Sequence, residues 1–485
     1  MQQFITQAFD HPSVVGVTTL ALIGAVVLAF GYLLSRVDVA VILAAGIALE
    51  LFSGYWSLMG IPIPLDRVVI ALAIVVLVLK GARQVSARRL VVRPLHNAFL
   101  LAATWALVSA IVAGTLTQHL AFYELLDAFG VVPFAIFTLA PIFFGTARQR
   151  NILLATLVGV GFYLGLTGLC EGLHLYQFVF PRYIANANLG IQFGRARGPL
   201  LESSSDGFCI FVGGVAAAVA LSAWRSPRAR AFCYLTIVLD GAAVFFTLTR
   251  SVWIGAFVGT VVALWLSPKR RLLVPMLVAG VLVVGTTLAV SSEIRSEVFG
   301  RVASLSPVWD RENTDLAAVR IVKDKPLTGV GWGNFINVSE NYMWQQPGYP
   351  ITGLGIEVHN MFLGNLANLG VPGFLLWFLA FAGAVWRGLL PSRRPQRHDA
   401  RPRAPAGEDA AWREPWRLGG IAVVLCFVVV ANLAPLTEAP ANMFLWVWLG
   451  VLAVPYTSRL RSARPARSAA PALGGRPAGI RPAYL

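Results

Sequence analysis

The chain has 485 residues, of which 57% are hydrophobic and 13% are charged, and its net charge is +16. With a mean hydropathy of +0.70, it has too few charged residues to cover the surface of a soluble protein of this length, so we expect an all-α polytopic membrane protein. The basic residues stand in short clusters between apolar runs, which argues against a nucleic-acid partner.

Apolar stretches close to the roughly 20 residues that cross a bilayer recur along the whole chain. They predict about 12–13 transmembrane helices embedded in membrane lipid, near residues 13–35, 38–58, 66–80, 95–114, 123–145, 151–172, 206–224, 231–249, 251–267, 272–291, 358–387, 417–434 and 443–457. The first run lacks a preceding basic region, so we expect a retained helix rather than a cleaved signal peptide.

The distribution of Lys and Arg predicts the orientation. Most of the 39 basic residues fall on one side, which is therefore expected to be cytoplasmic, together with a loop at 388–416 and a tail at 458–485 whose compositions are typical of disorder. The opposite side has two long loops, 173–205 and 292–357, rich in aromatic residues, Pro and Gly. The chain is thus predicted to divide into transmembrane regions 1–291 and 358–457, a folded and partly helical extracytoplasmic loop 292–357, and the tail.

The four cysteines, Cys170, Cys209, Cys233 and Cys426, lie in or beside apolar runs. None belongs to a Cys-x-x-Cys pair, so neither a disulfide framework nor a zinc site is predicted. The sequence also lacks H-E-x-x-H, G-x-S-x-G and D-x-D motifs. No metal and no cofactor is predicted.

Arg250 stands in the middle of an apolar run from Ala231 to Leu266. As one helix this run would be about 54 Å long, which exceeds a bilayer core of roughly 30 Å. The run is therefore predicted to fold back with Arg250 at the apex. A charge at that depth indicates a functional residue, although an arginine that snorkels at a hairpin tip is the alternative.

Further arginines lie in the two long loops. Arg195 and Arg197 precede a predicted helix, and residues 311–323 have the apolar spacing of an amphipathic helix with Arg311 at its start and Arg320 on another face. Guanidinium groups bind phosphate bidentately, so these side chains are candidates for binding an anionic substrate. The alternative is that they are solvated surface charges.

His359 opens the predicted helix 358–387, which is overlong and interrupted at Gly370 and Pro372. A histidine near its ordinary pKa is the commonest general base, whereas an interfacial histidine that bonds a neighbouring carbonyl is the alternative. Asn360 begins a stripe of small and polar residues on the same helix, which suits close helix packing or the wall of a wet cavity.

Three stretches together resemble the O-antigen ligase and O-antigen polymerase superfamily of bacterial membrane glycosyltransferases. They are TLTRSVWIGAFVG, RENTDLAAVRIVKDKPLTGVGWGNF and HNMFLGNLANLGVPGFLLWF, in that order. The resemblance implies about a dozen helices with a folded periplasmic loop, in the bacterial inner membrane. It also implies transfer of a glycan from an undecaprenyl-diphosphate carrier to a glycan, lipid A–core or other hydroxyl acceptor.

On matching positions, the resemblance implies that His359 activates the acceptor hydroxyl, while Arg250 and Arg311 engage the donor diphosphate. Asp315 stands where the family commonly has an aromatic residue, so Arg320 stays a rival to Arg311. Arg195, Arg197, Arg320 and Asn360 are further candidates for substrate binding.

Two other functions remain open at this stage. A repeat-unit polymerase would use the same residues with a different acceptor. A flippase or other transporter would show internal repeats and charged residues near the bilayer midplane, whereas here only Glu50 and Asp240 look deep.

Overall fold

The computed structural model describes residues 36–83, 94–345, 348–351, 353–390, 412–436 and 438–453, which all fall within one compact unit, residues 1–454. The predicted helix at 13–35 and the predicted tail 458–485 lie outside the described residues, as does most of the predicted loop 388–416.

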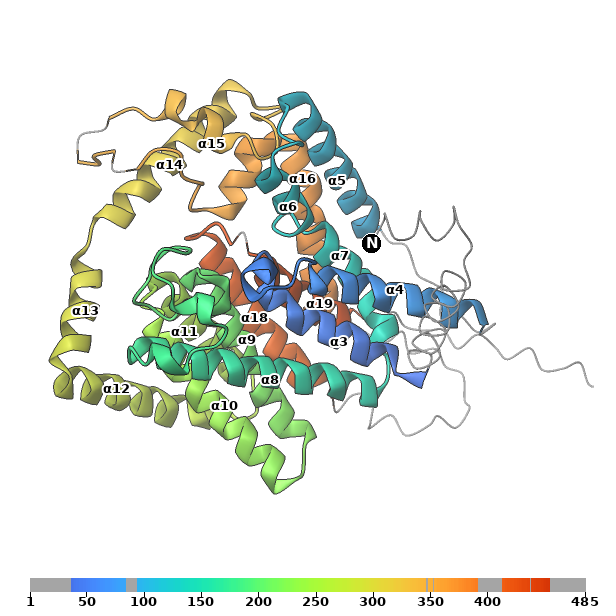
Figure 1. The fold of residues 1–485 in the computed structure, drawn as a ribbon, viewed down its shortest axis with the longest axis vertical. Helices are drawn as coiled ribbons and strands as arrows, with labels where there is room; N and C mark the ends of the chain where they lie inside the picture. Colours follow the sequence, from blue (N-terminus) through green and yellow to red (C-terminus); the bar gives the residue numbers. More distant parts are fainter. Residues whose placement is uncertain are drawn as a thin grey trace, which may run out of the picture. The chain divides into compact units, whose positions relative to one another are not determined.

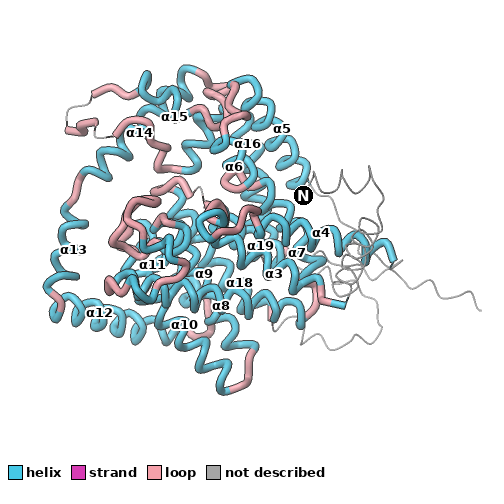
Figure 2. The backbone as a smooth tube through the Cα atoms, in the orientation of Figure 1, coloured by secondary structure: helices cyan, strands magenta, loops and turns pink. Residues whose placement is uncertain are grey.

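The described chain consists of α-helices joined by loops and short 3-10 turns, without a β-strand (Figure 1; Figure 2). Eight helices of this described part are long and apolar enough to cross a membrane, so the predicted fold class is confirmed. The helices are α3 (Val39–Leu49), α4 (Leu65–Arg83), α5 (Pro94–Ala113), α6 (His119–Leu126), α7 (Val131–Phe143), α8 (Ala147–Gly172), α9 (Ser203–Ala223), α10 (Pro227–Phe246), α11 (Arg250–Trp265), α12 (Leu273–Val290), α13 (Ser292–Ala303), α14 (Ser306–Asp324), α15 (Phe335–Val338), α16 (Met361–Leu389), α18 (Arg413–Ala431) and α19 (Ala439–Leu452).

Every predicted span from 38–58 onward contains a helix, but the span 38–58 is too long, and the span 123–145 consists of two helices. Helix α3 ends at Leu49, and the following segment turns at Gly54 and Gly60, whose φ angles of 83° and 77° lie in the left-handed region. Within the predicted span 123–145, Gly130 with φ 99° separates α6 from α7. Glycine adopts this conformation without steric cost, and a helix cannot continue through it.

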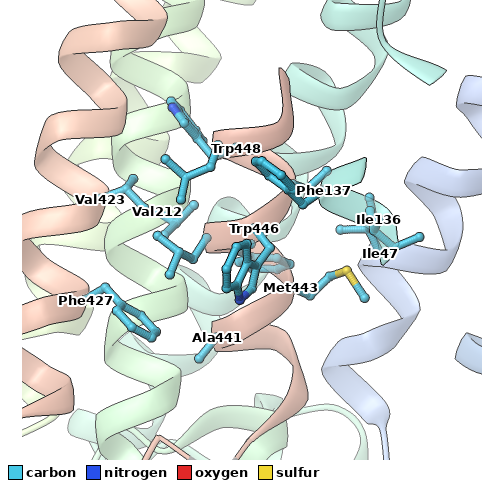
Figure 3. Packing of buried hydrophobic residues seen from close by; sticks show 14 of the residues in the cluster. Ile47, Ile136, Phe137, Val212, Val423, Phe427, Ala441, Met443, Trp446 and Trp448 are labelled. Carbon is cyan, nitrogen blue, oxygen red and sulfur yellow. The ribbon is translucent and has the colours of Figure 1, made fainter. Parts of the chain in front are cut away.

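Helix α19 forms the centre of the transmembrane unit. All of its residues, Ala439–Leu452, are buried, as expected for a helix that is apolar on every side. Figure 3 shows Trp446 and Trp448 of α19 among side chains of the surrounding helices, including Phe137 of α7 and Phe427 of α18.

Helices α8, α9 and α10 pack closely through glycines. A Cβ on Gly213 of α9 would lie 2.3 Å from the Cα of Gly161 on α8, so the two backbones are in contact. Asp240 of α10 is 2% exposed and lies against Gly161 and Gly165. Small residues at such interfaces allow the close approach that stabilises helices in lipid.

Helix α16 is broken at Gly370, which has φ 68° and ψ 178°, two residues before Pro372. The break frees backbone carbonyls that α16 itself cannot pair. The segment after α14 pairs them: Val330 N–H donates to the Ala367 carbonyl at 3.0 Å, and Gly331 N–H donates to the Asn368 carbonyl at 3.0 Å. The predicted interruption is therefore present, and it fastens the loop after α14 to α16.

Helix α14 confirms the predicted helix but begins earlier than predicted, and its buried face consists of Asn313, Thr314, Ala317, Ala318 and Ile321. It starts at Ser306, with Pro307 in its first turn, where proline is favoured. The expectation that Arg311 lies at the helix start is therefore wrong. Arg311 lies in the second turn, away from the positive end of the helix dipole.

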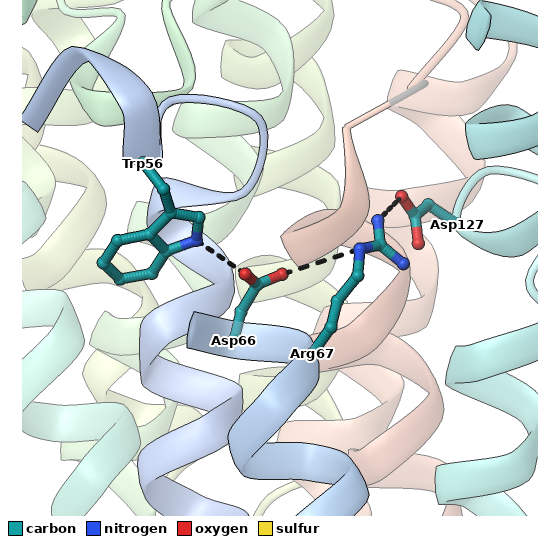
Figure 4. A network of polar contacts seen from close by, with 4 residues as sticks. All are labelled: Trp56, Asp66, Arg67 and Asp127. Atoms are coloured by element: carbon teal, nitrogen blue, oxygen red, sulfur yellow. Dashed lines mark hydrogen bonds and ion pairs between the residues drawn. The ribbon is translucent and has the colours of Figure 1, made fainter. Parts of the chain in front are cut away.

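A polar network fixes the segment between α3 and α4 (Figure 4). Trp56 Nε1 donates to Asp66 at 2.6 Å, and the Arg67 guanidinium donates to Asp127 at 2.6 Å. Asp66 and Arg67 belong to the first turn of α4, whereas Asp127 follows α6. The network thereby sets the position of Tyr55, the neighbour of Trp56.

The contact between α8 and α9 generates a stability prediction. Gly213→Ala places a methyl group against the backbone of Gly161, so we expect a loss of about 1–3 kcal/mol and a lower thermal unfolding midpoint in detergent. Gly241→Ala is the matched control, because a Cβ there has no neighbour within 4 Å. It should change stability by less than about 1 kcal/mol. Equal midpoints for the two variants would contradict the packing argument.

Candidate functional site

A cavity of about 340 Å³ lies where segments distant in the sequence meet. We call it the loop cavity. Its ionisable lining residues come from five parts of the chain: Arg195 and Glu202, Arg250, Arg311, His359, and Glu438. Four of the predicted site residues, Arg195, Arg250, Arg311 and His359, therefore line one cavity.

Arg250 reaches the cavity from a hairpin tip, as the length of the apolar run predicts. Helix α10 ends at Phe246 and α11 begins at Arg250, and Leu248 between them has a φ of 49°. Trp253 Nε1 donates to the carbonyls of Val244 and Phe245, which closes the hairpin. The Arg250 guanidinium donates to the Ser304 carbonyl at 3.0 Å, which links the hairpin to the segment before α14.

Arg311 faces the same cavity from α14. Burial lowers the pKa of its guanidinium, and the positive charge of Arg250 lowers this pKa further. The Arg311 Nε is buried without a hydrogen-bond partner among the described residues. Two arginines that repel each other across a cavity form a site that an anion would stabilise, because arginine forks bind phosphate oxygens bidentately.

Arg320 points elsewhere. Its guanidinium donates to the Tyr342 carbonyl at 2.6 Å and lies 4.2 Å from the centre of the Trp344 ring. It does not line the loop cavity. Of the two rival loop arginines, the structure places Arg311 at the cavity and holds Arg320 within its own loop.

His359 lies directly before α16. Burial lowers the pKa of its imidazole below the ordinary value of 6.5, and the charge of Arg311 lowers it further, against smaller raising effects of Asp310, the Glu357 backbone and Glu202. Its Nδ1 is buried and has no hydrogen-bond partner in the described part of the chain. A neutral imidazole in a cavity can accept a proton from a hydroxyl at neutral pH.

Arg197 does not line the cavity. It is 0% exposed, and its guanidinium donates to four carbonyls of its own loop, those of Ile184, Asn186, Leu189 and Ile191. The Glu171 carboxylate accepts from the backbone N–H groups of Arg197 and Gly198. These contacts give Arg197 a structural role in the loop that carries Arg195 and Glu202.

Asn360 also lies outside the cavity lining. Its side-chain oxygen accepts from the N–H groups of Phe362 and Leu363 and thereby caps α16, and its amide nitrogen donates to Asn432. An N-cap stabilises a helix by about 1 kcal/mol. Asn360 thus fixes the start of the helix beside His359.

Sequence reasoning missed two acidic residues of the cavity, Glu202 and Glu438. Each stands directly before a helix, α9 or α19, on the same side as His359. Acidic residues at helix N-termini are ordinary capping residues, so position alone gave no reason to single them out. Within the described residues, no three His, Cys, Asp or Glu side chains are grouped closely enough to hold a metal ion.

Residues 235–378 match the model of a family described as O-antigen ligase. The matched region runs from α10 into α16 and contains Arg250, Arg311 and His359. No curated protein matches the chain. The family match confirms the resemblance for this region and supports a membrane enzyme of surface polysaccharide biosynthesis.

The arrangement of the arginines predicts where a diphosphate binds. Arg250→Gln and Arg311→Gln should each weaken the binding of inorganic pyrophosphate to the purified protein by about tenfold or more, because each removes a charge-assisted contact. Arg320→Gln is the matched control and should bind as the wild type does. Isothermal titration calorimetry measures this, and loss of binding in Arg320→Gln alone would reverse the assignment.

Proposed function

We propose that this protein is a glycosyltransferase that moves a glycan from an undecaprenyl-diphosphate carrier to an acceptor hydroxyl, at the periplasmic face of the bacterial inner membrane. The observation that carries the proposal is the meeting of Arg250, Arg311 and His359 in one cavity. These residues come from three separate stretches that resemble the family, and they lie within the region that matches the O-antigen ligase model.

The arginines would stabilise the leaving group. The donor's diphosphate would lie between Arg250 and Arg311. The positive charges of these two side chains repel each other, and the negative diphosphate would offset this repulsion. As the bond between the anomeric carbon and the diphosphate oxygen breaks, its electron pair stays on that oxygen. Fixed guanidinium groups stabilise the charge that develops there, without reorganisation during the reaction.

His359 would activate the nucleophile. Its neutral imidazole takes the proton from the acceptor hydroxyl while the hydroxyl oxygen forms the new glycosidic bond to the anomeric carbon. The products are the glycosylated acceptor, undecaprenyl diphosphate and a proton on His359, which is released to solvent before the next turnover. A single displacement of this kind uses one base and no covalent enzyme intermediate.

The helix ends support the orientation. Clusters of basic residues follow α9, α11 and α16 or lie at the start of α8, α10 and α18, at the helix ends opposite those that lead to the cavity. Lys and Arg accumulate on the cytoplasmic side of membrane proteins, which places the loop cavity toward the periplasm in this proposal.

Replacing the proposed base generates a direct prediction. His359→Asn keeps a polar side chain but cannot take up the proton, so glycan transfer should fall by about 100-fold or more while the protein stays folded. The matched control is His174→Asn, which lies outside the cavity at a φ of 56° that asparagine tolerates. Transfer is measured with purified protein and a polyprenyl-diphosphate-linked glycan, offering either lipid A–core or a second carrier-linked unit as acceptor. Full transfer by His359→Asn would refute its role as base, and the preferred acceptor distinguishes a ligase from a polymerase.

The pH dependence follows from the lowered pKa of His359. The base acts in its neutral form, so kcat/KM should fall as the pH drops through a pKa below 6.5. Arg311→Gln removes a cation that lowers this pKa and should move the acid limb to higher pH. Arg250→Gln is the control, because Arg250 is not among the charges that act on His359. An acid limb that stays in place in Arg311→Gln would contradict the assignment of the limb to His359.

A further inference from the structure

Two carboxyl groups of the loop cavity have no part in the transfer as proposed. Glu202 and Glu438 line the cavity together with three arginines that are suited to an anion. A negative charge beside a diphosphate site weakens binding of the donor. Carboxyl groups at this place are therefore better explained by the binding of a second ligand.

The charged groups of the cavity fall into two sets according to which groups act on each other. Arg311 is affected by the charge of Arg250, and Glu438 is affected by the charge of Glu202. His359 is affected by both Arg311 and Glu202. The histidine therefore lies within reach of a basic set on the one hand and an acidic set on the other.

The two carboxyl groups differ in what they can offer a ligand. The Glu202 carboxylate is fixed at the start of α9, where it accepts from Ser204 N–H at 2.8 Å and Ser205 N–H at 2.6 Å, one to each oxygen. Each oxygen retains a second lone pair for another donor. Burial raises the pKa of Glu438 to about 8, so its carboxyl carries a proton at neutral pH and can donate.

Glu438 also lacks a partner of its own. Its carboxyl makes no hydrogen bond or ion pair with any other described residue, and it caps no helix. Glu438 is half-buried and lines the cavity, so its carboxyl can form hydrogen bonds with a ligand or water there. This group in the cavity wall offers a place where a ligand can bind.

An aromatic ring accompanies the acidic set. Tyr55 lines the cavity, and its ring stacks on that of Tyr183 with centroids 5.2 Å apart. The carboxyl groups of Glu438 and Glu202 both influence the Tyr55 hydroxyl, so the three side chains are neighbours. A fixed apolar ring face beside one hydrogen-bond acceptor and one donor suits a ligand that is both flat-faced and rich in hydroxyl groups, such as a sugar ring.

We propose that Tyr55, Glu202 and Glu438 form an acceptor subsite that binds an uncharged, hydroxyl-rich sugar and presents one of its hydroxyls to His359. The inference rests on the proposed function, since it names the class of acceptor for that reaction. A sugar that carries a carboxylate or phosphate at this place is repelled by Glu202, so the same residues select against acidic acceptors.

The test compares two small probes and a donor-side probe on the full chain in lipid nanodiscs. Methyl glucoside is the neutral probe, methyl glucuronide is its acidic counterpart, and inorganic pyrophosphate reports on the arginines. Saturation-transfer NMR measures binding of the sugars in the millimolar range, and calorimetry measures binding of pyrophosphate. The wild type should bind the glucoside about tenfold more tightly than the glucuronide.

The variants separate charge from hydrogen bonding. Glu438→Ala should weaken glucoside binding by about tenfold, whereas Glu438→Gln, which keeps a donor, should retain it within about threefold. Glu202→Gln removes the repelling charge and should abolish the preference for the glucoside over the glucuronide. Pyrophosphate binding should persist in all three variants. Glu340→Gln, at an exposed position outside the cavity, is the matched control and should behave as the wild type does.

Several outcomes would overturn the subsite. They are no glucoside binding by the wild type, unchanged binding in Glu438→Ala, a persistent preference in Glu202→Gln, or parallel loss of pyrophosphate binding. Failure of the proposed function looks different: the sugar results hold, but the wild type transfers no glycan from a polyprenyl-diphosphate donor. Transfer with an unaffected acceptor KM in Glu438→Ala would instead remove the subsite and leave the proposed function standing.

Discussion

Backbone carbonyls inside a membrane protein must be hydrogen-bonded. The break in α16 leaves carbonyls that the loop after α14 pairs, and these hydrogen bonds connect two walls of the loop cavity. The φ of 68° at Gly370 interrupts the helix, and residues 330 and 331 donate to the carbonyls that the break frees. A Cβ at Gly370 would lie 2.5 Å from the backbone of Leu327, so only glycine allows this approach. The loop after α14 is thereby fastened to the helix that His359 precedes, which fixes α14 and its Arg311 relative to the histidine.

The other wall depends on a second buried polar group. The guanidinium of Arg197 is removed from water and finds its acceptors among the carbonyls of its own loop. A cation in this position is tolerated because these bonds and the nearby Glu171 offset its desolvation, although burial still lowers its pKa. The loop so ordered ends at Glu202, which accepts from the first turn of α9. Residues that bind no substrate in this arrangement therefore determine where the cavity residues lie.

The sequence allowed much of this architecture to be predicted, since apolar length and helix-breaking residues act locally. The hairpin at Arg250 follows from a run too long for one crossing, and the interruption of α16 follows from Gly370 and Pro372. Local sequence patterns could not predict which side chains meet in the folded protein. Arg195 and Arg197 look alike in sequence, yet only Arg195 lines the cavity. Arg311 and Arg320 differ likewise by their neighbours, because the Tyr342 carbonyl and the Trp344 ring hold Arg320. Glu438 gained significance only when the fold brought it beside Glu202.

The charges of the cavity also bear on how one histidine can serve the transfer. A base must be neutral before the reaction, and Arg311 favours the neutral imidazole of His359. In the proposed reaction, a donor diphosphate bound beside Arg311 would partly cancel the effect of Arg311 on the pKa of His359, and the raising effects of Asp310 and Glu202 would gain weight. Binding of the proposed donor would thus raise the proton affinity of the imidazole at the stage when it must take up a proton. In the proposed reaction, Asp310 and Glu202 would then stabilise the imidazolium as the acceptor oxygen attacks, so that donor occupancy and activation of the acceptor would be linked through a single side chain.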